Sequence, residues 1–241
     1  MKSYGLIGKN LGHSFSKTFF EDYFNAHSLN ASYTNIELDS IIMVEDVFTL
    51  GYSGLNVTIP YKEEIIPFLD ELSDEAKSIG AVNVISFNQG KSIGYNTDAY
   101  GFHQSIKPFL TNLHERAVIF GTGGASKAVV HVLKSIGVDV VLISRNPKEA
   151  NEFSYDEVNS HMLNACKLVV NCTPVGTYPN VNDVLDIPFE FLTKDHLVVD
   201  LIYNPKRTAF LTEAEKNGAT ILNGESMLKQ QAIKAWEIWN K

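Results

Sequence analysis

The sequence predicts an α/β protein with two domains: an N-terminal α/β domain with a mixed sheet, and a C-terminal Rossmann-type domain with a parallel sheet. Residues 117–145 follow the order strand, glycine turn, helix, strand, which is typical of a dinucleotide-binding unit. Residues 1–100 alternate strands and helices of their own, so they need a separate core. The last segment, 225–241, has helical spacing and no strand after it, so we expect it to complete the first domain, leaving 101–224 as the second.

Composition limits the classes of partner. The chain has 241 residues, of which 44% are hydrophobic and 20% charged, enough for two modest cores. The formal net charge of -8 argues against a nucleic-acid partner. No apolar run approaches the roughly 20 residues that span a bilayer, and MKSYGLIGKN lacks a signal-peptide core. We therefore expect a cytoplasmic protein with no membrane role, present as a monomer or homodimer.

Cysteine and histidine usage predicts neither a disulfide framework nor a metal site. Cys166 and Cys172 are too few and too close along the chain for a framework, so we expect both to be reduced packing residues. The seven histidines form no cluster with ligand spacing, so no metal is expected.

The first domain begins with a strand at 4–8 and an aromatic-rich helix at 15–27. Either Ser14 or Ser16 can cap that helix, and from spacing alone this structural role is the better interpretation of both serines. The elements that follow are a strand at 31–38, a helix at 41–50 and a strand at 54–59.

The end of the 54–59 strand is unusually polar. Asn56 and Thr58 alternate with apolar residues, so both should lie on one face, and Pro60 ends the strand just before Lys62. A lone lysine after a strand is usually solvated, but three polar groups directed from one strand end favour a small-molecule site.

The rest of the first domain leads to a second polar cluster. We expect a helix from Lys62 to about Glu71, a strand with Asn83 near its start, and a hairpin bracketed by Gly90 and Gly94. Asp98 then stands at the entrance of a helix at 98–113, kinked near Pro108. This aspartate can cap the helix, serve a site, or do both.

The glycine turn of the second domain predicts a phosphate site. Gly121 permits the tight turn and Gly123 allows the backbone to approach a pyrophosphate, while the following helix directs its first amides at the phosphates. The third glycine of the usual fingerprint falls on Ser126, and Gly124 and Ala125 supply the small residues. A glycine-rich turn can also be only a turn, so the flanking strands and helix strengthen this interpretation.

The second strand of this unit ends in Ser144-Arg145-Asn146. No carboxylate is present to hold ribose hydroxyls, which favours NADP over NAD, although Arg145 can also be an ordinary solvated charge. A polar, helix-prone segment follows to Ala165. Strands are expected at 168–172, 196–203 and 219–222, with a helix through Glu213 to Gly218. The final helix, 226–239, should bring Gln231 toward the ligand cleft, although a surface position is commoner for glutamine.

Eight motifs in order make the chain resemble the shikimate dehydrogenase family of the aromatic amino-acid pathway. They are SFS at 14–16, NVTIPYK at 56–62, GAVN at 80–83, NTDAYG at 96–101, GTGGA at 121–125, NCTPVG at 171–176, DLIYNP at 200–205 and GESMLKQQ at 224–231. The resemblance implies NADPH-dependent, reversible reduction of 3-dehydroshikimate to shikimate, with Lys62 and Asp98 as the catalytic pair. The implied substrate ligands are Ser14, Ser16, Asn56, Thr58, Lys62, Asn83, Asp98, Tyr203 and Gln231. The implied cofactor ligands are Gly121, Thr122, Gly123, Gly124, Ala125, Ser144, Arg145, Asn146, Leu201, Gly224 and Asp74.

Two departures from the family pattern affect the cofactor. The usual Asn-Arg-Thr triplet is here Ser-Arg-Asn, and the second basic residue common a few positions on falls on Glu149. The segment 147–166 is also short for the family, which suggests a trimmed helix or a lost edge strand. Two alternatives keep the same motifs: a quinate/shikimate dehydrogenase that uses NAD, and a catalytically silent sensor of shikimate and nucleotide. Retention of Lys62 and Asp98 argues against the sensor.

Overall fold

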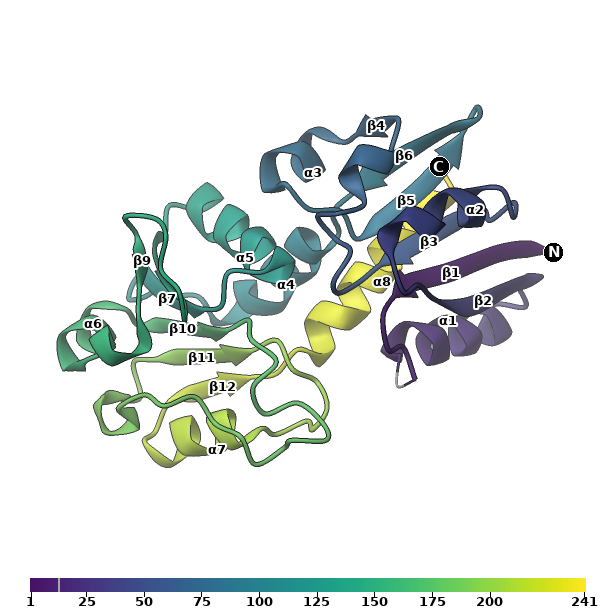
Figure 1. The fold of residues 1–241 in the computed structure, drawn as a ribbon. Helices are drawn as coiled ribbons and strands as arrows, with labels where there is room; N and C mark the ends of the chain where they lie inside the picture. The colour runs from purple at the N-terminus through teal and green to yellow at the C-terminus, as the bar shows by residue number, and fades with distance from the viewer. Residues whose placement is uncertain (13) are drawn as a thin grey trace. The chain divides into compact units, whose positions relative to one another are not determined.

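The computed structural model describes residues 1–12 and 14–241. The chain forms two compact units: Met1–Gly101 with Leu228–Lys241, and Phe102–Met227. Each unit contains one six-stranded sheet (Figure 1). The expected α/β class with a mixed sheet followed by a parallel Rossmann-type sheet is confirmed.

The sheet of the first unit has the order β2-β1-β3-β5-β6-β4. Its strands are β1 (Lys2–Gly8), β2 (Ala31–Glu37), β3 (Gly54–Val57), β4 (Glu71–Leu72), β5 (Val84–Asn88) and β6 (Lys91–Tyr95). β1 pairs in parallel with β2 and β3, whereas β5 is antiparallel to both β3 and β6. The mixed pairing follows from the tight turn at Gln89 and Gly90, whose positive φ angles suit a two-residue hairpin.

Helices complete the first unit. They are α1 (Phe15–Ala26), α2 (Val44–Phe48), α3 (Asp74–Ile79) and α8 (Glu225–Trp239), with 3₁₀ turns η1 (Ile41–Met43) and η2 (Ile66–Phe68). The expected helix from Lys62 to Glu71 is wrong. A turn and the short η2 occupy that stretch, because Pro67 has no N–H to continue an α-helix through it. Gly94 lies within β6 rather than bracketing the turn, since its small size accommodates Leu69 and Leu72.

The C-terminal helix α8 is held against the first sheet by one indole ring. Trp239 Nε1 donates to the Ile85 carbonyl at 2.9 Å, and its ring lies where a Cβ on Gly54 would be. Tyr4 stacks on the same ring with centroids 4.8 Å apart. Gly54 has no side chain, and the Trp239 ring packs into the space that this leaves. The final helix therefore belongs to the first unit's core, as its spacing predicted.

The second unit has a parallel sheet of order β12-β11-β10-β7-β8-β9. The strands are β7 (Arg116–Phe120), β8 (Asp139–Ile143), β9 (Glu152–Phe153), β10 (Leu168–Asn171), β11 (Leu197–Asp200) and β12 (Thr220–Leu222). Numbered from β7, this is the 3-2-1-4-5-6 order of dinucleotide-binding sheets. Its topological switch point lies between β7 and β10, where the glycine turn begins.

The helices of the second unit are short. They are α5 (Gly124–Ser135), α6 (Ser160–Ala165) and α7 (Ala209–Lys216), with η3 (Lys107–Phe109), η4 (Tyr155–Glu157) and η5 (Phe189–Phe191). α4 (Asp98–Ile106) begins in the first unit and ends before Pro108, earlier than expected, because the proline continues only as a 3₁₀ turn. The segment 147–166 keeps a two-residue edge strand, β9, so the sheet edge is trimmed rather than lost.

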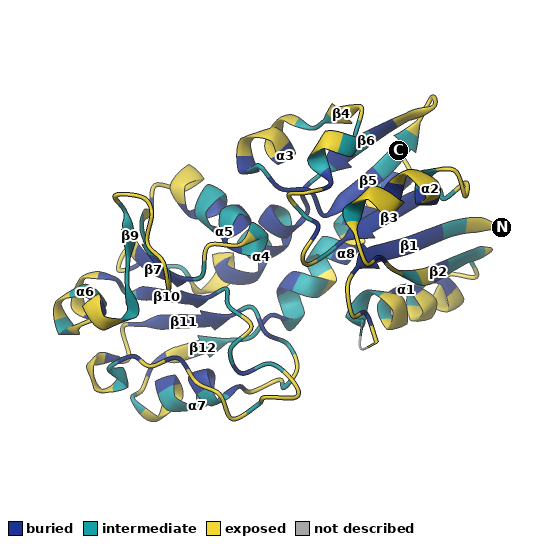
Figure 2. Cartoon of the chain, viewed as in Figure 1, coloured by how far each residue is buried: buried dark blue, intermediate teal, exposed yellow. Residues whose placement is uncertain are grey.

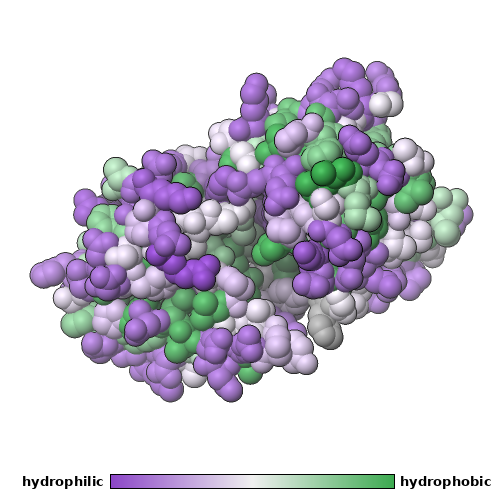
Figure 3. All heavy atoms as spheres, viewed as in Figure 1, coloured by the Kyte–Doolittle hydropathy of each residue, from purple (hydrophilic) through white to green (hydrophobic). Residues whose placement is uncertain are grey.

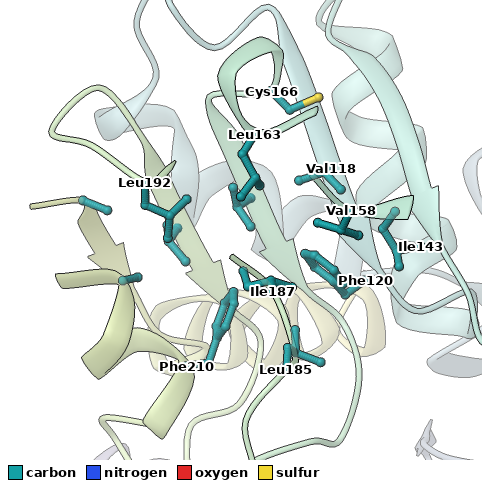
Figure 4. Close-up of a cluster of buried hydrophobic side chains, with 14 of the residues drawn as sticks. Val118, Phe120, Ile143, Val158, Leu163, Cys166, Leu185, Ile187, Leu192 and Phe210 are labelled. Carbon is teal, nitrogen blue, oxygen red and sulfur yellow. The ribbon is translucent and has the colours of Figure 1, made fainter. Parts of the chain in front are cut away.

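Both sheets have apolar centres. In Figure 2 the central strands of each sheet are dark blue, which marks buried residues. The core of the second unit includes the buried rings of Phe120 and Phe210. Figure 4 shows these two rings among Leu185, Ile187 and Val158. On the face drawn in Figure 3, hydrophilic residues cover most of the surface. No helix among the described residues is long and apolar enough to cross a membrane.

Candidate active site

Lys62 lies in the turn after β3, and its backbone is fixed on both sides. The carbonyl of Lys62 accepts a hydrogen bond from the Val82 amide at 2.7 Å. The neighbouring Tyr61 is buried and its hydroxyl donates to the Leu38 carbonyl at 2.6 Å. These anchors hold the lysine backbone, while its side chain remains 14% exposed.

The Lys62 ammonium and the Asp98 carboxylate form an ion pair with an Nζ–Oδ2 distance of 2.6 Å. Asp98 is the first residue of α4, where the helix dipole favours a negative charge. Its side chain is only 3% exposed. The other oxygen, Oδ1, accepts from Asn83 Nδ2 at 3.0 Å, so the carboxylate has partners beyond its own helix.

Asn83 connects the ion pair to the C-terminal helix. It lies just before β5 and is 1% exposed. Its Oδ1 accepts from the Thr97 amide at 2.7 Å, which fixes the amide orientation. Its Nδ2 donates to Asp98 and also to Gln231 Oε1, at 2.9 Å. Gln231 therefore lies beside Asn83, because α8 packs on the same sheet.

Asn56 and Thr58 occupy different local environments. Asn56 is a buried residue of β3, and its Nδ2 donates to the Asn83 carbonyl at 3.2 Å. Thr58 lies just past the end of the strand, half-buried, with its amide bonded to the Ile7 carbonyl. The expected strand through Ile59 is therefore two residues too long, since Thr58 begins the turn that presents Lys62.

The two serines of the SFS motif differ in role. Ser14 is the N-cap of α1, and its hydroxyl accepts from the Lys17 amide at 3.4 Å. Ser16 lies inside the helix, and its hydroxyl interacts with the buried phenol of Tyr33. Only Ser14 therefore has the capping role that spacing suggested. Tyr33 was not singled out by the sequence, because its alternation in β2 is that of an ordinary core residue.

The glycine turn of the second unit leaves room for a phosphate group. Gly121 follows β7 with φ +99° and packs close to Thr173, so only glycine suits the position. Gly123 is the N-cap of α5, and a Cβ added there would meet nothing within 4 Å. Gly123 has no side chain to cap α5, which leaves the first amides of this helix suited to a ligand. Thr122, Gly124 and Ala125 complete this turn.

The end of β8 carries the residues expected at the adenosine phosphate. Ser144 Oγ accepts from the Asn146 amide at 3.2 Å, which shapes the turn around Arg145. The Arg145 side chain is exposed beside Tyr155: burial raises the pKa of Tyr155 and the nearby guanidinium lowers it. An exposed arginine side chain at the end of a strand can bind an anionic group.

Leu201 and Gly224 come together after β11 and β12. The Gly224 amide donates to the Ile202 carbonyl at 3.0 Å, and the Leu201 carbonyl occupies the space that a Cβ on Gly224 would need. Tyr203 follows in the same segment, half-buried. This contact requires glycine at 224.

A buried carboxylate supports that segment. Asp200, the last residue of β11, accepts from Thr208 Oγ1 at 2.6 Å, from Asn171 Nδ2 at 3.1 Å and from the Ile202 amide at 3.1 Å. Burial raises its pKa to about 6, and the three hydrogen bonds oppose that rise. Neither Asp200 nor Asn171 was among the expected site residues, although both lie in motifs noted in the sequence.

The structure groups the expected residues into two sets. The first unit contains Ser14, Ser16, Asn56, Thr58, Lys62, Asn83, Asp98 and Gln231, together with Asp74. Asp74 begins α3 and is exposed, and no described contact links it to the other members of this set. The second unit contains the glycine turn, the Ser144–Asn146 turn, Leu201, Gly224 and Tyr203. Tyr203 is thus on the unit that carries the glycine turn rather than the serines.

Within residues 1–12 and 14–241, no group of three or more His, Cys, Asp or Glu side chains could hold a metal ion. Cys166 and Cys172 are both free thiols. Burial raises the pKa of each thiol, which keeps both protonated and weakly reactive.

Comparison with known proteins is consistent along the whole chain. Residues 6–85 match the family model described as the shikimate dehydrogenase substrate binding domain. A shikimate dehydrogenase (NADP(+)) of Desulforamulus reducens is 38% identical, with 98% of this chain and 88% of the relative covered.

Solved structures agree. Shikimate dehydrogenase 1 from Peptoclostridium difficile is 36% identical, with a TM-score of 0.89 over 100% of this chain and 92% of that one. Shikimate 5-dehydrogenase from Thermus thermophilus, solved with NADP(H) and shikimate, is 30% identical, with a TM-score of 0.87 over 99% and 93% of the two chains. The chain belongs to the shikimate dehydrogenase family.

Proposed function

We propose that this protein catalyses the reversible, NADPH-dependent reduction of 3-dehydroshikimate to shikimate. The observation that supports this best is the Lys62–Asp98 ion pair, joined through Asn83 to Gln231. Three polar side chains from distant parts of the sequence are linked by hydrogen bonds, and one of them, Asp98, pairs with the largely buried Lys62. Such an arrangement can bind hydroxyl groups and deliver a proton at one place.

We assign the two functions to different parts of the chain. Residues 1–100 with 225–241 are the substrate-binding domain, and 101–224 bind NADP. The compact units Met1–Gly101 with Leu228–Lys241 and Phe102–Met227 support this division to within a few residues. The substrate ligands are Ser14, Ser16, Asn56, Thr58, Lys62, Asn83, Asp98, Tyr203 and Gln231.

Lys62 is the general acid of the reduction. Reduction of a ketone leaves negative charge on the former carbonyl oxygen, and a positioned ammonium can donate a proton to it. In the reverse direction the amine accepts the proton. Asp98 holds the Lys62 ammonium in place through Oδ2 and is available to a substrate hydroxyl. We therefore assign Asp98 to positioning rather than to proton removal.

The remaining polar residues account for binding of a hydroxylated ring. Asn56, Asn83 and Gln231 have neutral amides whose orientation is fixed by neighbours. A site built from such groups rejects an analogue that lacks a hydroxyl, because a buried amide is then left unpaired. Ser14 and Ser16 are assigned to the carboxylate of the substrate.

The second unit fits NADP(H), which when bound supplies or accepts the hydride. The open space at Gly123 and the uncapped start of α5 suit a pyrophosphate. Arg145 is assigned to the 2′-phosphate, with Ser144 and Asn146 shaping its turn. Leu201 and Gly224 form the close contact proposed to border the nicotinamide, and Asp74 is a further proposed cofactor residue.

Absorbance of the reduced nicotinamide tests the proposal directly. Purified protein is mixed with shikimate or quinate and with NADP or NAD, in all four combinations. The proposed function predicts the highest kcat/KM with shikimate and NADP. A preference for NAD with quinate would instead identify the catabolic alternative, and binding of both ligands without turnover would identify a sensor.

The expected partners are small molecules. A net charge of -8 supports the absence of a nucleic-acid partner. NADPH is made and used inside cells, so the cytoplasm is the proposed compartment. Size-exclusion chromatography with light scattering distinguishes a monomer from a homodimer.

A further inference from the structure

Tyr33 places its hydroxyl inside a largely aromatic cluster of the first unit. The residue is 2% exposed, and its ring stacks on Phe20 with centroids 4.7 Å apart and planes 16° apart. A phenylalanine would fill the same space. A hydroxyl buried among hydrocarbon is unfavourable unless it is hydrogen-bonded, so its partners indicate what it is for.

The hydrogen-bond partner of that hydroxyl is a residue of the proposed substrate site. The Tyr33 hydroxyl donates to Asn56 Oδ1 at 2.6 Å. Strand register explains the reach. Tyr33 on β2 is opposite Tyr4 on β1, which is opposite Gly54 on β3, two residues before Asn56. These residues share one face of the sheet, because side chains alternate along a strand.

The direction of each hydrogen bond is determined by the Asn83 carbonyl. A backbone carbonyl can only accept, so the Asn56 atom that faces it at 3.2 Å is the Nδ2 amide group. Oδ1 of Asn56 therefore faces Tyr33, and the phenol donates its single proton to this oxygen. Burial raises the pKa of Tyr33 well above its usual value, so the phenol keeps this proton.

The Asn56 amide nitrogen carries two protons. One N–H donates to the Asn83 carbonyl, and the second N–H is left for a ligand.

We propose that Tyr33 is a positioning residue of the substrate site: its phenol fixes the Asn56 amide so that one N–H is kept for a ligand oxygen. This inference rests on the proposed function, because it assigns Asn56 to shikimate. Tyr33 touches no reacting atom in this scheme. It should therefore affect binding of shikimate and not the chemical step.

The test compares Tyr33→Phe with the matched control Tyr4→Phe. Tyr4 is the directly paired residue on β1, is equally buried, and belongs to the same cluster, but its hydroxyl has no hydrogen-bond partner among the described residues. Each substitution removes one phenolic oxygen. Tyr33→Phe should raise the KM for shikimate about tenfold, with kcat within about twofold and the KM for NADP unchanged. Tyr4→Phe should leave all three constants close to those of the parent.

An unchanged KM for shikimate in Tyr33→Phe, or a lower kcat at unchanged KM, overturns the proposal. If Tyr33→Phe unfolds below the assay temperature, Asn56→Ala provides a second test. It should give the same rise in KM, and an unchanged KM would equally overturn the proposal. In the double variant, loss of the phenol should add little to the loss of the amide, since both act at one contact. Fully multiplicative effects would contradict it.

The proposed function and the role of Tyr33 can fail separately. A parent protein that oxidises shikimate with NADP, combined with a silent Tyr33→Phe, removes only the inference. An inactive parent removes the proposed function. Calorimetric titration of the same proteins with shikimate then measures affinity without turnover, and a selective loss in Tyr33→Phe still supports the positioning role, while equal affinities overturn it.

Discussion

Asn83 and Gln231 are 148 residues apart in the sequence, yet Asn83 Nδ2 donates to Gln231 Oε1 at 2.9 Å. The contact is made because α8 returns to the first sheet and its Trp239 packs on Gly54. The same Asn83 amide holds the Asp98 carboxylate. The C-terminal helix thus contributes a polar group directly beside the Lys62–Asp98 pair.

Replacing Gln231 by alanine tests this contribution. We expect the KM for shikimate to rise about tenfold with kcat little changed, because one hydrogen bond to the substrate is lost. Steady-state kinetics measure both constants. Gln230→Ala is the control, since the next residue of a helix is turned by about 100° from its neighbour. Equal kinetic effects of the two changes would remove Gln231 from the site.

Replacing Lys62 by alanine should reduce kcat about 10²- to 10⁴-fold, because the proton donor of the transition state is lost. The affinity for shikimate, measured by calorimetry, should change much less. Lys91→Ala is the control, since Lys91 forms an exposed ion pair with Glu71 in the same unit. Near-parental kcat in Lys62→Ala would show that the lysine is not the acid.

Gly123→Ala should separate cofactor binding from folding. The φ angle of Gly123 is -81°, which alanine adopts, and a Cβ there meets no atom of the protein. We expect the free energy of unfolding to fall by less than about 1 kcal/mol and NADP affinity to fall at least about tenfold. Gly121→Ala should instead destabilise the fold, because alanine at φ +99° is strained. Thermal unfolding and fluorescence titration with NADPH measure the two effects, and normal affinity in Gly123→Ala would exclude a phosphate at this turn.

Arg145→Ala should weaken NADPH binding about tenfold to a hundredfold while changing NADH binding little, because only the former has a 2′-phosphate for the guanidinium. KM values for both cofactors give the comparison. Lys134→Ala, an exposed lysine in the last turn of α5, is the control for lost positive charge. Equal losses for both cofactors would assign Arg145 to the adenosine rather than to the phosphate.

Because burial raises the pKa of Asp200, we expect this residue to make the free energy of unfolding depend on pH. Burial raises this pKa to about 6, above the ordinary aspartate value of 3.8, so the folded protein binds this proton more tightly than the unfolded chain. The stabilisation is fully present below about pH 4, falls as the pH rises, and is lost above about pH 6. The difference amounts to about 3 kcal/mol.

Urea unfolding of the parent and Asp200→Asn across this pH range measures that dependence. The stability of the parent relative to the variant should decrease from pH 4 to pH 6 and then become constant. The difference in unfolding free energy between the two proteins cancels the contribution of other titrating groups. These include His114 and His196, whose pKa values are lowered mainly by burial. Parallel curves for the two proteins would show that Asp200 titrates normally.

The sequence determined most of the fold. Periodicity and glycine turns located strands β1, β2, β7, β8, β10 and β12 and helices α1, α5 and α8 within a few residues, because these patterns are local. Motif order identified the family. The helix expected after Lys62 was wrong because Pro67 overrode an apolar pattern, and the short α3 and β9 were missed because two to six residues show too little periodicity.

The tertiary structure alone decided which side chains meet. The sequence named Asn56, Asn83 and Gln231 as separate candidates, but their mutual contacts depend on strand register and on the packing of α8. It gave no signal for Tyr33, whose alternation is that of a core residue, and the motif that contains Asp200 did not single out its carboxylate. A hydrogen bond across a sheet is set by the relative position of strands far apart in the chain, and a single sequence records the residues but not that distance.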